Sequence, residues 1–379
     1  MLSNLPVGFL LTVLILGVAT VCALWPKRAP GPLGTGMYLA GMGVNEIPLV
    51  AALWAVPGTV LTLADDDPLT PGGILGAVIL VVAWVGLGVV AYRAVRSADV
   101  PEAAMRASLG TDWRSGVEPG RPNLLRAFLL PFLRRRRDVE RVRNIAYDDG
   151  GRRHLLDVYR HRSRPQGCPV FAHFHGGHFV SGAKNRESLP LLYHLASRGW
   201  LCVSANYRLT SFPDYVVDAK RVLAWVQEQG ASYGADPSVV FVAGNSAGGY
   251  LASFAALTPN QPEYQPGFEG IDTSVTAAVC QYGYYGTTAG DPRSTPAAHV
   301  SEEAPPFLVV HGDRDTMVPV EWTREFVAEL KAASREPVVY MELPDAQHTF
   351  DYFNSLRAQL VAERIEAFAG WVRSRANAR

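Results

Sequence analysis

The chain has 379 residues, which is long enough for one large domain and a second, smaller part, since domains usually contain about 100–250 residues. Lysine plus arginine and aspartate plus glutamate balance at 35 each, so no net charge attracts nucleic acid as a partner. The cysteines form no C-x-x-C pair and mostly lie in or beside apolar runs, which favours buried, reduced thiols over a disulfide or a metal site: Cys22, Cys168, Cys202 and Cys280.

Residues 1–95 are predicted to be a transmembrane anchor. Pro6 to Trp25 is an uninterrupted apolar run, long enough at 1.5 Å per residue to cross a hydrocarbon core of about 30 Å. A signal peptide would need a basic segment before this run, and no Lys or Arg precedes Lys27. Gly72 to Tyr92 is a second clear span. Between these two lies a weaker span, which polar residues and prolines interrupt. The predicted spans lie near residues 6–25, 38–63 and 72–92.

Charged residues at the ends of these spans predict their orientation. Lys27 and Arg28 follow the first span, Arg93 and Arg96 follow the last, and Asp65 to Asp67 lie between the second and the third. With three spans, both basic flanks fall on the same side, which the positive-inside rule assigns to the cytoplasm. We therefore expect an integral protein of a bacterial inner (plasma) membrane, with the amino terminus and the aspartates outside and everything after Tyr92 in the cytoplasm.

Glu46, beside Asn45, is the acidic residue of the weaker span. An ionisable group inside a membrane can mark a functional site. Its place near one end of the predicted span favours an interfacial residue instead.

Residues 96–143 are predicted to be a basic, amphipathic linker or cap. The stretch NLLRAFLLPFLRRRR, from Asn123 to Arg137, combines leucines and phenylalanines with a run of arginines. Such a segment can lie on an anionic membrane surface, or its leucines can cover the following domain. Both alternatives place it beside the membrane.

Residues 144–379 are predicted to form the catalytic domain. Ile145–Tyr147 and Leu155–Tyr159 have the pattern of a hairpin, and apolar strands then alternate with helical segments. This alternation predicts a mostly parallel sheet with helices on both faces, with ligands bound beyond the carboxyl ends of the strands. The further strands are expected at 170–174, 201–205, 239–243, 277–281, 307–310 and 338–343, with helices at 188–197 and 212–229.

The segment after the predicted strand Val239–Ala243 contains the motif G-x-S-x-G, as Gly244-Asn245-Ser246-Ala247-Gly248. Between a strand and a helix, the small residues of this motif permit a sharp turn that holds the serine hydroxyl clear of the sheet. The helix amino terminus behind it favours developing negative charge. Ser246 is therefore the predicted nucleophile.

A serine nucleophile needs a base and an orienting acid, which in this fold follow it in the order acid, histidine. After the strand ending at Val310 the sequence reads HGDRDTMVP, with candidate acids Asp313 and Asp315. After Leu343 it reads PDAQHTF, and His348 precedes the closing helix, which makes it the predicted base. The other histidines near strand ends are expected to hold loops by hydrogen bonds: His173, His175 and His311.

With these motifs together, the chain resembles the α/β-hydrolase superfamily, in particular the hormone-sensitive-lipase-like esterases and related bacterial carboxylesterases. The resemblance covers roughly residues 144–379 and rests on HGG at 175–177, NYRL at 206–209, GNSAGG at 244–249, HGDRDTMVP at 311–319 and His348. It implies an α/β-hydrolase fold and assigns the acid to Asp315. It also implies an oxyanion hole formed by the N–H groups of Gly176, Gly177 and Ala247, with no cofactor and no metal.

The chain departs from this family at two places. His178 stands where relatives often have a third glycine, and it is expected either to line the substrate pocket or to pack beneath the amphipathic segment. Phe179 and Asn245 are further candidates for that pocket. The second departure is the short segment 282–304, which leaves room for only a small insertion, so residues 100–143 or the membrane surface would have to form a lid.

The predicted function is a membrane-anchored serine hydrolase that cleaves carboxylic esters through an acyl-enzyme, and its esters are expected to be lipophilic. An amidase or acyltransferase with the same triad stays open as an alternative, and a ligand receptor is less favoured because Ser246, Asp315 and His348 are all present. A transporter is disfavoured because Asn45 and Glu46 are almost the only polar residues of the spans. The expected partners are an ester substrate and the membrane; acyl length and oligomeric state are not predicted.

Overall fold

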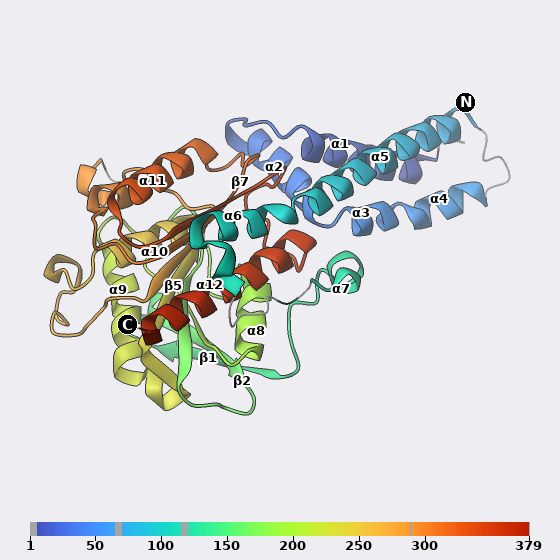
Figure 1. The fold of residues 1–379 in the computed structure, drawn as a ribbon. Coiled ribbons are helices and arrows are strands. Elements are labelled where there is room, and N and C mark those ends of the chain that lie inside the picture. The colour runs from blue at the N-terminus through green and yellow to red at the C-terminus, as the bar shows by residue number, and fades with distance from the viewer. Residues whose placement is uncertain (1–5, 65–69, 115–119, 121, 289, 379) are drawn as a thin grey trace.

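The computed structural model describes residues 6–64, 70–114, 120, 122–288 and 290–378. A bundle of apolar helices projects from a larger domain in which a sheet is covered by helices (Figure 1). Asp65 to Asp67, used above to predict orientation, lie outside the described residues.

The bundle is formed by α1 (Val7–Leu24), α2 (Gly31–Glu46), α3 (Pro48–Trp54), α4 (Val56–Leu63) and α5 (Pro71–Arg96). Among the described residues, α1 and the helix that begins at Pro71 are each long and apolar enough to cross a membrane. Large apolar side chains on both helices remain exposed, as on Leu11, Val18, Val78 and Val85. Helices that face lipid present such a surface.

The predicted span 38–63 is not one straight helix. Its chain bends by 102° between α2 and the α3–α4 segment. The break falls at Ile47, directly before Pro48, which has no N–H to continue the hydrogen bonding of α2 and instead begins α3.

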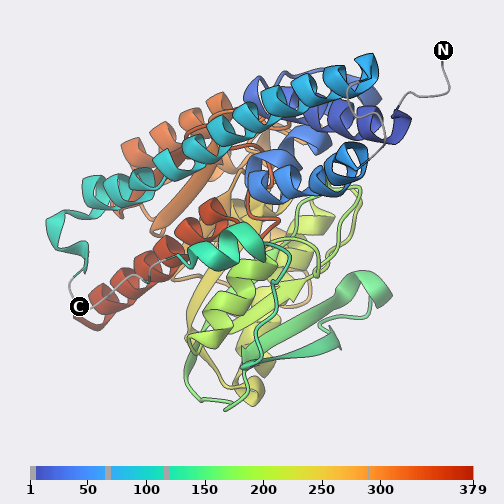
Figure 2. The ribbon, with the colours of Figure 1, turned by 90° about the vertical axis from the view of Figure 1, so that its right-hand side faces the viewer.

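The chain nevertheless reverses direction within the described part of the bundle. Phe9, near the start of α1, lies against Gly58 of α4 and Gly76 of α5, while at the other end Arg93 of α5 donates to the Leu24 carbonyl at 3.1 Å. Thus α1 and α5 run toward the sheet, and α3 and α4 run away from it (Figures 1 and 2). Helix α2 lies at the sheet end.

The central sheet has eight strands in the order β1-β2-β4-β3-β5-β6-β7-β8. β1 and β2 form the predicted hairpin, β2 is antiparallel to β4, and the remaining neighbours are parallel. This arrangement confirms the predicted mostly parallel sheet. The strands are β1 (Val139–Ala146), β2 (Leu155–His161), β3 (Cys168–Phe174), β4 (Leu201–Ala205), β5 (Ala235–Asn245), β6 (Ala277–Gln281), β7 (Phe307–Gly312) and β8 (Val338–Leu343).

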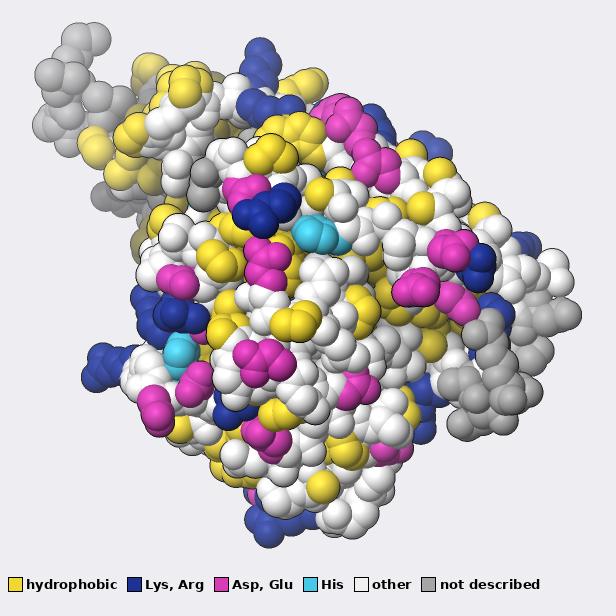
Figure 3. All heavy atoms as spheres, turned by 90° about the vertical axis from the view of Figure 1, so that its left-hand side faces the viewer, with side chains coloured by type: hydrophobic (Ala, Val, Ile, Leu, Met, Phe, Trp, Pro, Cys, Tyr) yellow, Lys and Arg dark blue, Asp and Glu magenta, His cyan; other side chains and the backbone are white. Residues whose placement is uncertain are grey.

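Helices cover both faces of the sheet. One apolar core lies beneath α9 (Asp214–Gln229), α10 (Ala247–Leu257) and α11 (Val320–Ala333). The second lies beneath α6 (Asp99–Leu109), α8 (Leu189–Ser197) and α12 (Leu356–Ala378). Away from the bundle, acidic and basic side chains are interspersed over the domain surface, whereas apolar side chains gather on the visible part of the bundle behind it (Figure 3).

The segment predicted as a linker is partly built into the second core. Met105 of α6 and Trp113 are buried there together with Phe368 of α12. The short helix α7 (Leu124–Leu129) instead packs against α3 and α12. Residues 99–114 are therefore a structural part of the α/β domain, while the segment around α7 lies beside the bundle.

Glu46 is buried between the bundle and the α/β domain, neither free in a membrane nor at an aqueous interface. Its Oε1 lies 3.0 Å from Nη1 of Arg357 on α12, and both side chains are only 1% exposed. Ser355 donates to the other carboxylate oxygen of Glu46 at 2.9 Å, and the Asn45 side chain donates to the Asp345 carbonyl at 3.0 Å. This buried polar seam, formed by Asn45, Glu46, Asp345, Ser355 and Arg357, joins α2 to the loop between β8 and α12.

Replacing Arg357 by methionine is expected to lower stability strongly, because the Glu46 carboxylate then stays buried without its cation. Breaking such a pair costs about 3–5 kcal/mol. The measurement is the apparent melting temperature of the full-length protein in detergent micelles, followed by tryptophan fluorescence. The control is Glu46→Gln/Arg357→Met, which removes both charges and should recover most of the loss. A single variant as stable as wild type would contradict the expectation.

Candidate active site

The predicted catalytic residues follow the carboxyl ends of neighbouring parallel strands. Ser246 follows β5, Asp315 follows β7, and His348 follows β8. Because β5, β6, β7 and β8 are adjacent and parallel, these strand ends share one edge of the sheet. All three side chains are almost fully buried there.

Ser246 occupies the sharp turn between β5 and α10. Its backbone has φ 54° and ψ −118°, a conformation that L-residues rarely adopt. The glycines of the motif are required by close packing, since a Cβ on Gly244 would lie 2.0 Å from the Gly248 carbonyl oxygen. One on Gly248 would lie equally close, 2.0 Å, to the carbonyl oxygen of Phe174 on β3. The tight turn of the G-x-S-x-G motif is thus present.

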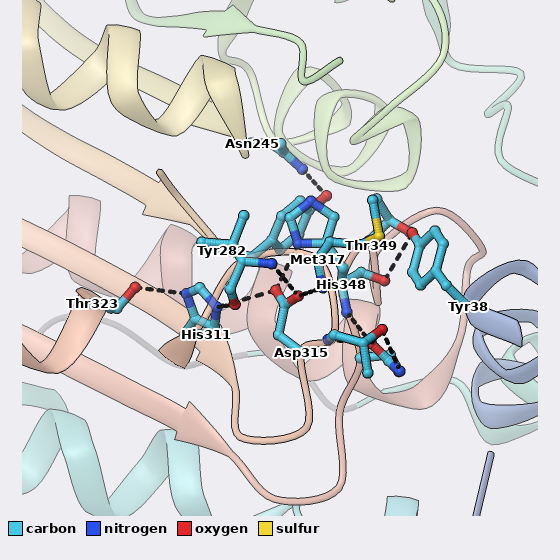
Figure 4. A network of polar contacts seen from close by, with 12 residues as sticks. Tyr38, Asn245, Tyr282, His311, Asp315, Met317, Thr323, His348 and Thr349 are labelled. Carbon is cyan, nitrogen blue, oxygen red and sulfur yellow. Dashed lines mark hydrogen bonds and ion pairs between the residues drawn. The ribbon is translucent and has the colours of Figure 1, made fainter. Parts of the chain in front are cut away.

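Asp315 is the carboxylate that contacts His348. Nδ1 of His348 donates to Asp315 Oδ2 at 2.6 Å (Figure 4). The other carboxylate oxygen accepts from the backbone N–H groups of Met317 and Val318, at 2.7 and 2.8 Å. Asp315 is therefore held from two sides, and Nε2 of His348 is left as the nitrogen that can accept a proton.

The charge state of Asp315 follows from these contacts. Burial alone would raise its pKa, but the nearby His348 and the hydrogen bonds from His311 and His348 outweigh burial and hold the pKa well below its usual range. Asp313, the alternative acid, instead accepts from the N–H of Asp345 at 2.7 Å. Of the two candidate acids, it is therefore Asp315 that lies against His348.

His311 has a larger part in the site than the sequence indicated. Its Nε2 lies 3.1 Å from Asp315 Oδ2, and its Nδ1 accepts from the Thr323 hydroxyl at 2.7 Å (Figure 4). The position of His311, four residues before the acid in the HGDRD stretch, could have indicated its contact with Asp315. His173 and His175 hold loops as expected, through Asn245 at 2.9 Å and the Gly176 carbonyl at 2.6 Å.

A pocket of about 480 Å³ opens over Ser246. His178 and Phe179, both candidates for the substrate pocket, line it together with Tyr284, Met317 and Trp322; for His178 this is the first of the two alternatives. Burial and the nearby His348 lower the pKa of His178, so its imidazole is neutral at neutral pH. None of the described residues between 100 and 143 lines this pocket, so of the two alternatives for a lid, this segment has no support from the pocket lining.

Asn245 does not line the pocket, contrary to expectation. Its side chain is fully buried behind Ser246, where it bonds His173, the Ser188 hydroxyl at 3.0 Å and Asp351 at 2.8 Å. Tyr282 also bonds Asp351, and its ring lies edge-on to the His348 ring with centroids 4.6 Å apart. Asn245, Tyr282 and Asp351 thus support the nucleophile and base from beneath, a role that spacing in the sequence did not signal.

The predicted oxyanion hole differs from the structure at Gly176. The Gly176 N–H donates to Glu187 Oε2 at 2.6 Å and is not free for a ligand. Gly177 follows Gly176 with φ 124°, and Ala247 follows Ser246 as the first residue of α10. Among the described residues, no hydrogen bond is made by the N–H of Gly177, and that of Ala247 has no partner within its own helix. Of the three N–H groups predicted to form the oxyanion hole, those of Gly177 and Ala247 therefore remain as candidates.

Glu187 was not singled out in the sequence, because a lone acid before a predicted helix is common. A Cβ on Gly176 would lie 3.0 Å from both its Oε2 and the Cβ of Ser246, so the carboxyl is beside the nucleophile. Burial, with the charge of Asp351, raises the pKa of Glu187 to about 7, although the Gly176 N–H and His348 oppose the change.

One group of side chains in the described part of the chain has a spacing compatible with a metal ion: His194, Glu363 and Glu366. His194 and Glu366 already pair with each other at 2.7 Å. The group lies on α8 and α12 and contributes no residue to the pocket over Ser246.

Comparison with known proteins agrees with this architecture. A family model described as BD-FAE matches residues 156–291. The probable carboxylic ester hydrolase LipM of Mycobacterium tuberculosis is 36% identical over 96% of this chain and 92% of its own length. Esterase LipQ of the same organism is 35% identical over 75% of this chain and 77% of its own length.

Solved structures share the fold. A thermophilic esterase from Thermogutta terrifontis, with butyrate bound, has a TM-score of 0.53 and 24% identity, covering 61% of this chain and 93% of the other. The same esterase phosphoramylated by tabun has a TM-score of 0.54 and 22% identity, covering 61% of this chain and 94% of the other. The chain belongs to the family of carboxylic ester hydrolases with the α/β-hydrolase fold that includes LipM.

Replacing Glu187 by glutamine is expected to change how stability depends on pH. An unfolded glutamate titrates near about 4.3, and the folded Glu187 near about 7, so within this window only the folded state binds the proton and stability falls as pH rises. The stability gained by Glu187→Gln should therefore grow between about pH 5 and 7, by roughly 1 kcal/mol per pH unit at most.

The measurement is the melting temperature of both proteins across this range, with Glu329→Gln on the exposed face of α11 as control. A difference between Glu187→Gln and wild type that does not vary with pH would contradict the expectation.

Proposed function

We propose that the protein is a membrane-anchored serine esterase that hydrolyses lipophilic carboxylic esters with Ser246, His348 and Asp315. The observation that carries the proposal is the buried His348–Asp315 contact of 2.6 Å beside the pocket that contains Ser246. Nδ1 of His348 donates to Asp315, which leaves Nε2 to accept the proton of Ser246 as its oxygen attacks the ester carbonyl.

The tetrahedral intermediate carries a negative charge on the former carbonyl oxygen. The N–H groups of Gly177 and Ala247 are the proposed donors to this oxyanion, aided by the amino terminus of α10. His348 then gives its proton to the departing alcohol, and water attacks the acyl-enzyme by the same sequence of proton transfers. His311 keeps Asp315 in place while His348 becomes positively charged.

The pocket favours an apolar acyl or alcohol group. Phe179, Tyr284, Met317, Val318 and Trp322 supply most of its walls, and the imidazole of His178 is neutral. Apolar walls with few polar groups bind a ligand mainly through removal of apolar surface from water. The expected substrate is therefore an uncharged ester with an aliphatic or aromatic group.

The apolar bundle is proposed to anchor the enzyme in the bacterial inner membrane through three passes: α1, α3 with α4, and α5. Arg28, after α1, and Arg93, near the end of α5, both lie at the sheet end of the bundle, where they contact the Asp315 carbonyl and Asp345. The positive-inside rule then assigns the catalytic domain to the cytoplasm.

Ser246→Ala is expected to lower the rate of p-nitrophenyl ester hydrolysis by at least about 10⁴-fold, because no nucleophile remains to form the acyl-enzyme. Initial rates of the detergent-solubilised full-length protein measure the effect. Ser253→Ala, in the helix that follows Ser246, is the matched control, since in the described part of the chain that hydroxyl bonds only the Tyr250 carbonyl of the same helix. Hydrolysis retained in Ser246→Ala would refute the assignment of the nucleophile.

Topology is tested by reporter fusions to the full chain. A green fluorescent protein joined after Arg379 should fluoresce, since this reporter folds in the cytoplasm, while alkaline phosphatase inserted after Asp67 should be active outside. Phosphatase activity from a fusion after Arg379 would place the catalytic domain outside and overturn the proposed orientation.

A further inference from the structure

A second pocket, of about 260 Å³, lies between α7, α8 and the start of α12. It is separate from the pocket over Ser246, with which it shares no lining residue. Its volume is below the range of about 300–1,000 Å³ that is typical of sites for whole drug-sized ligands. The pocket is therefore of a size for one compact polar group.

The lining of this pocket is strongly basic. Among the residues that the structure describes, four arginines line it, and one carboxylate, that of Glu363, opposes them. The histidine among the lining residues, His194, is paired with Glu366. The arginines are Arg126 on α7, Arg134 and Arg136 in the segment that follows, and Arg198 after α8.

These arginines are only partly neutralised by protein groups. Arg126 donates from Nη2 to the carbonyls of Leu133 and Arg135, at 3.4 and 3.1 Å, and its buried Nε has no hydrogen-bond partner among the described residues. Arg136 has Asp138 at 3.5 Å, and Arg198 has Glu366 at 3.7 Å. Burial, together with the positive charge of Arg136, lowers the pKa of Arg126. An anion between Arg126 and Arg136 would relieve this repulsion.

The surface next to the pocket is apolar. Large side chains on and after α7 are about half exposed, including Leu125 at 64% and Phe132 at 58%. The other exposed members are Leu124, Leu129, Leu130 and Leu133. α7 also packs against α3 of the bundle, so these side chains lie where the proposed membrane anchor meets the catalytic domain (Figures 1 and 2). A lipid that reached the arginines could lay its chains on this surface.

We propose that this arginine pocket binds the headgroup phosphate of an anionic phospholipid, with the acyl chains along the exposed side chains of residues 124–133. Guanidinium groups bind phosphate oxygens with paired hydrogen bonds, and the basic amphipathic surface matches an anionic leaflet. The proposal rests on the proposed membrane attachment, but not on the ester chemistry of Ser246.

The test is native mass spectrometry of the full-length protein in detergent micelles, with phosphatidylglycerol or phosphatidylcholine added. Wild type should retain phosphatidylglycerol in preference to phosphatidylcholine. Arg126→Ala/Arg136→Ala should weaken phosphatidylglycerol retention by about tenfold or more, and Arg136→Ala alone, in which the partly buried Arg126 is kept, should weaken it by less.

The matched control is Arg293→Ala/Arg335→Ala, which removes two arginines that are 66% and 75% exposed elsewhere on the catalytic domain. This control should bind phosphatidylglycerol like wild type. Equal retention by wild type and the Arg126/Arg136 variants would overturn the proposal. Displacement of the lipid by an equal concentration of inorganic phosphate would assign the pocket to free phosphate and also overturn it.

Hydrolysis of a soluble p-nitrophenyl ester by the same preparations separates the two proposals. The Arg126/Arg136 variants should hydrolyse it at the wild-type rate, which also shows that they are folded. Selective lipid binding in a protein without esterase activity would refute the proposed function and leave this inference standing.

Discussion

A carboxylate and a guanidinium without access to water join the two parts of this protein. Removing Glu46 and Arg357 from water carries a desolvation cost that only their mutual contact and the hydrogen bonds around them offset. Their position is therefore tightly fixed, and so is the position of α2 relative to α12. The loop that carries His348 lies between these two helices, and Tyr38 of α2 bonds Thr349, the residue after His348, at 2.5 Å.

Paired, buried polar groups hold the candidate active site together, as they do between Glu46 and Arg357. Buried polar groups are held because each has a partner, and the partners come from different strands. Asp315 is fixed by backbone N–H groups, by His311 and by His348. Beneath Ser246, Asn245 and Asp351 connect the nucleophile turn to the segment after His348. The polar groups around Asp315 and beneath Ser246 are thus held in place before a substrate binds, and fixed polar groups of this kind are a usual source of electrostatic catalysis.

The sequence predicted the parts of the fold that depend on local pattern. Strand positions followed from apolar runs, and Ser246, Asp315 and His348 followed from motifs placed after strands. The errors concern contacts between distant segments. The side chain of Asn245 turned inward because Asp351 and Tyr282, far along the chain, offered partners. The Gly176 N–H, predicted to be free for the oxyanion, donates to Glu187. The Glu46 carboxylate, predicted to be interfacial, pairs with Arg357 on the last helix. No local spacing encodes such pairings. The bend at Ile47, by contrast, coincides with a local signal, the proline at position 48.

The contacts between the amino-terminal region and the active-site loops constrain how the protein can evolve. Anchors that are joined to enzymes only by a flexible tether can be exchanged or lost without harm to the active site. Here Arg28, Tyr38 and Glu46 of the amino-terminal region contact the very loops that hold the acid and the base. A change on either side of this contact must be matched by one on the other. The apolar bundle and the hydrolase domain are therefore expected to evolve as one inherited unit, with their contact residues varying together among relatives.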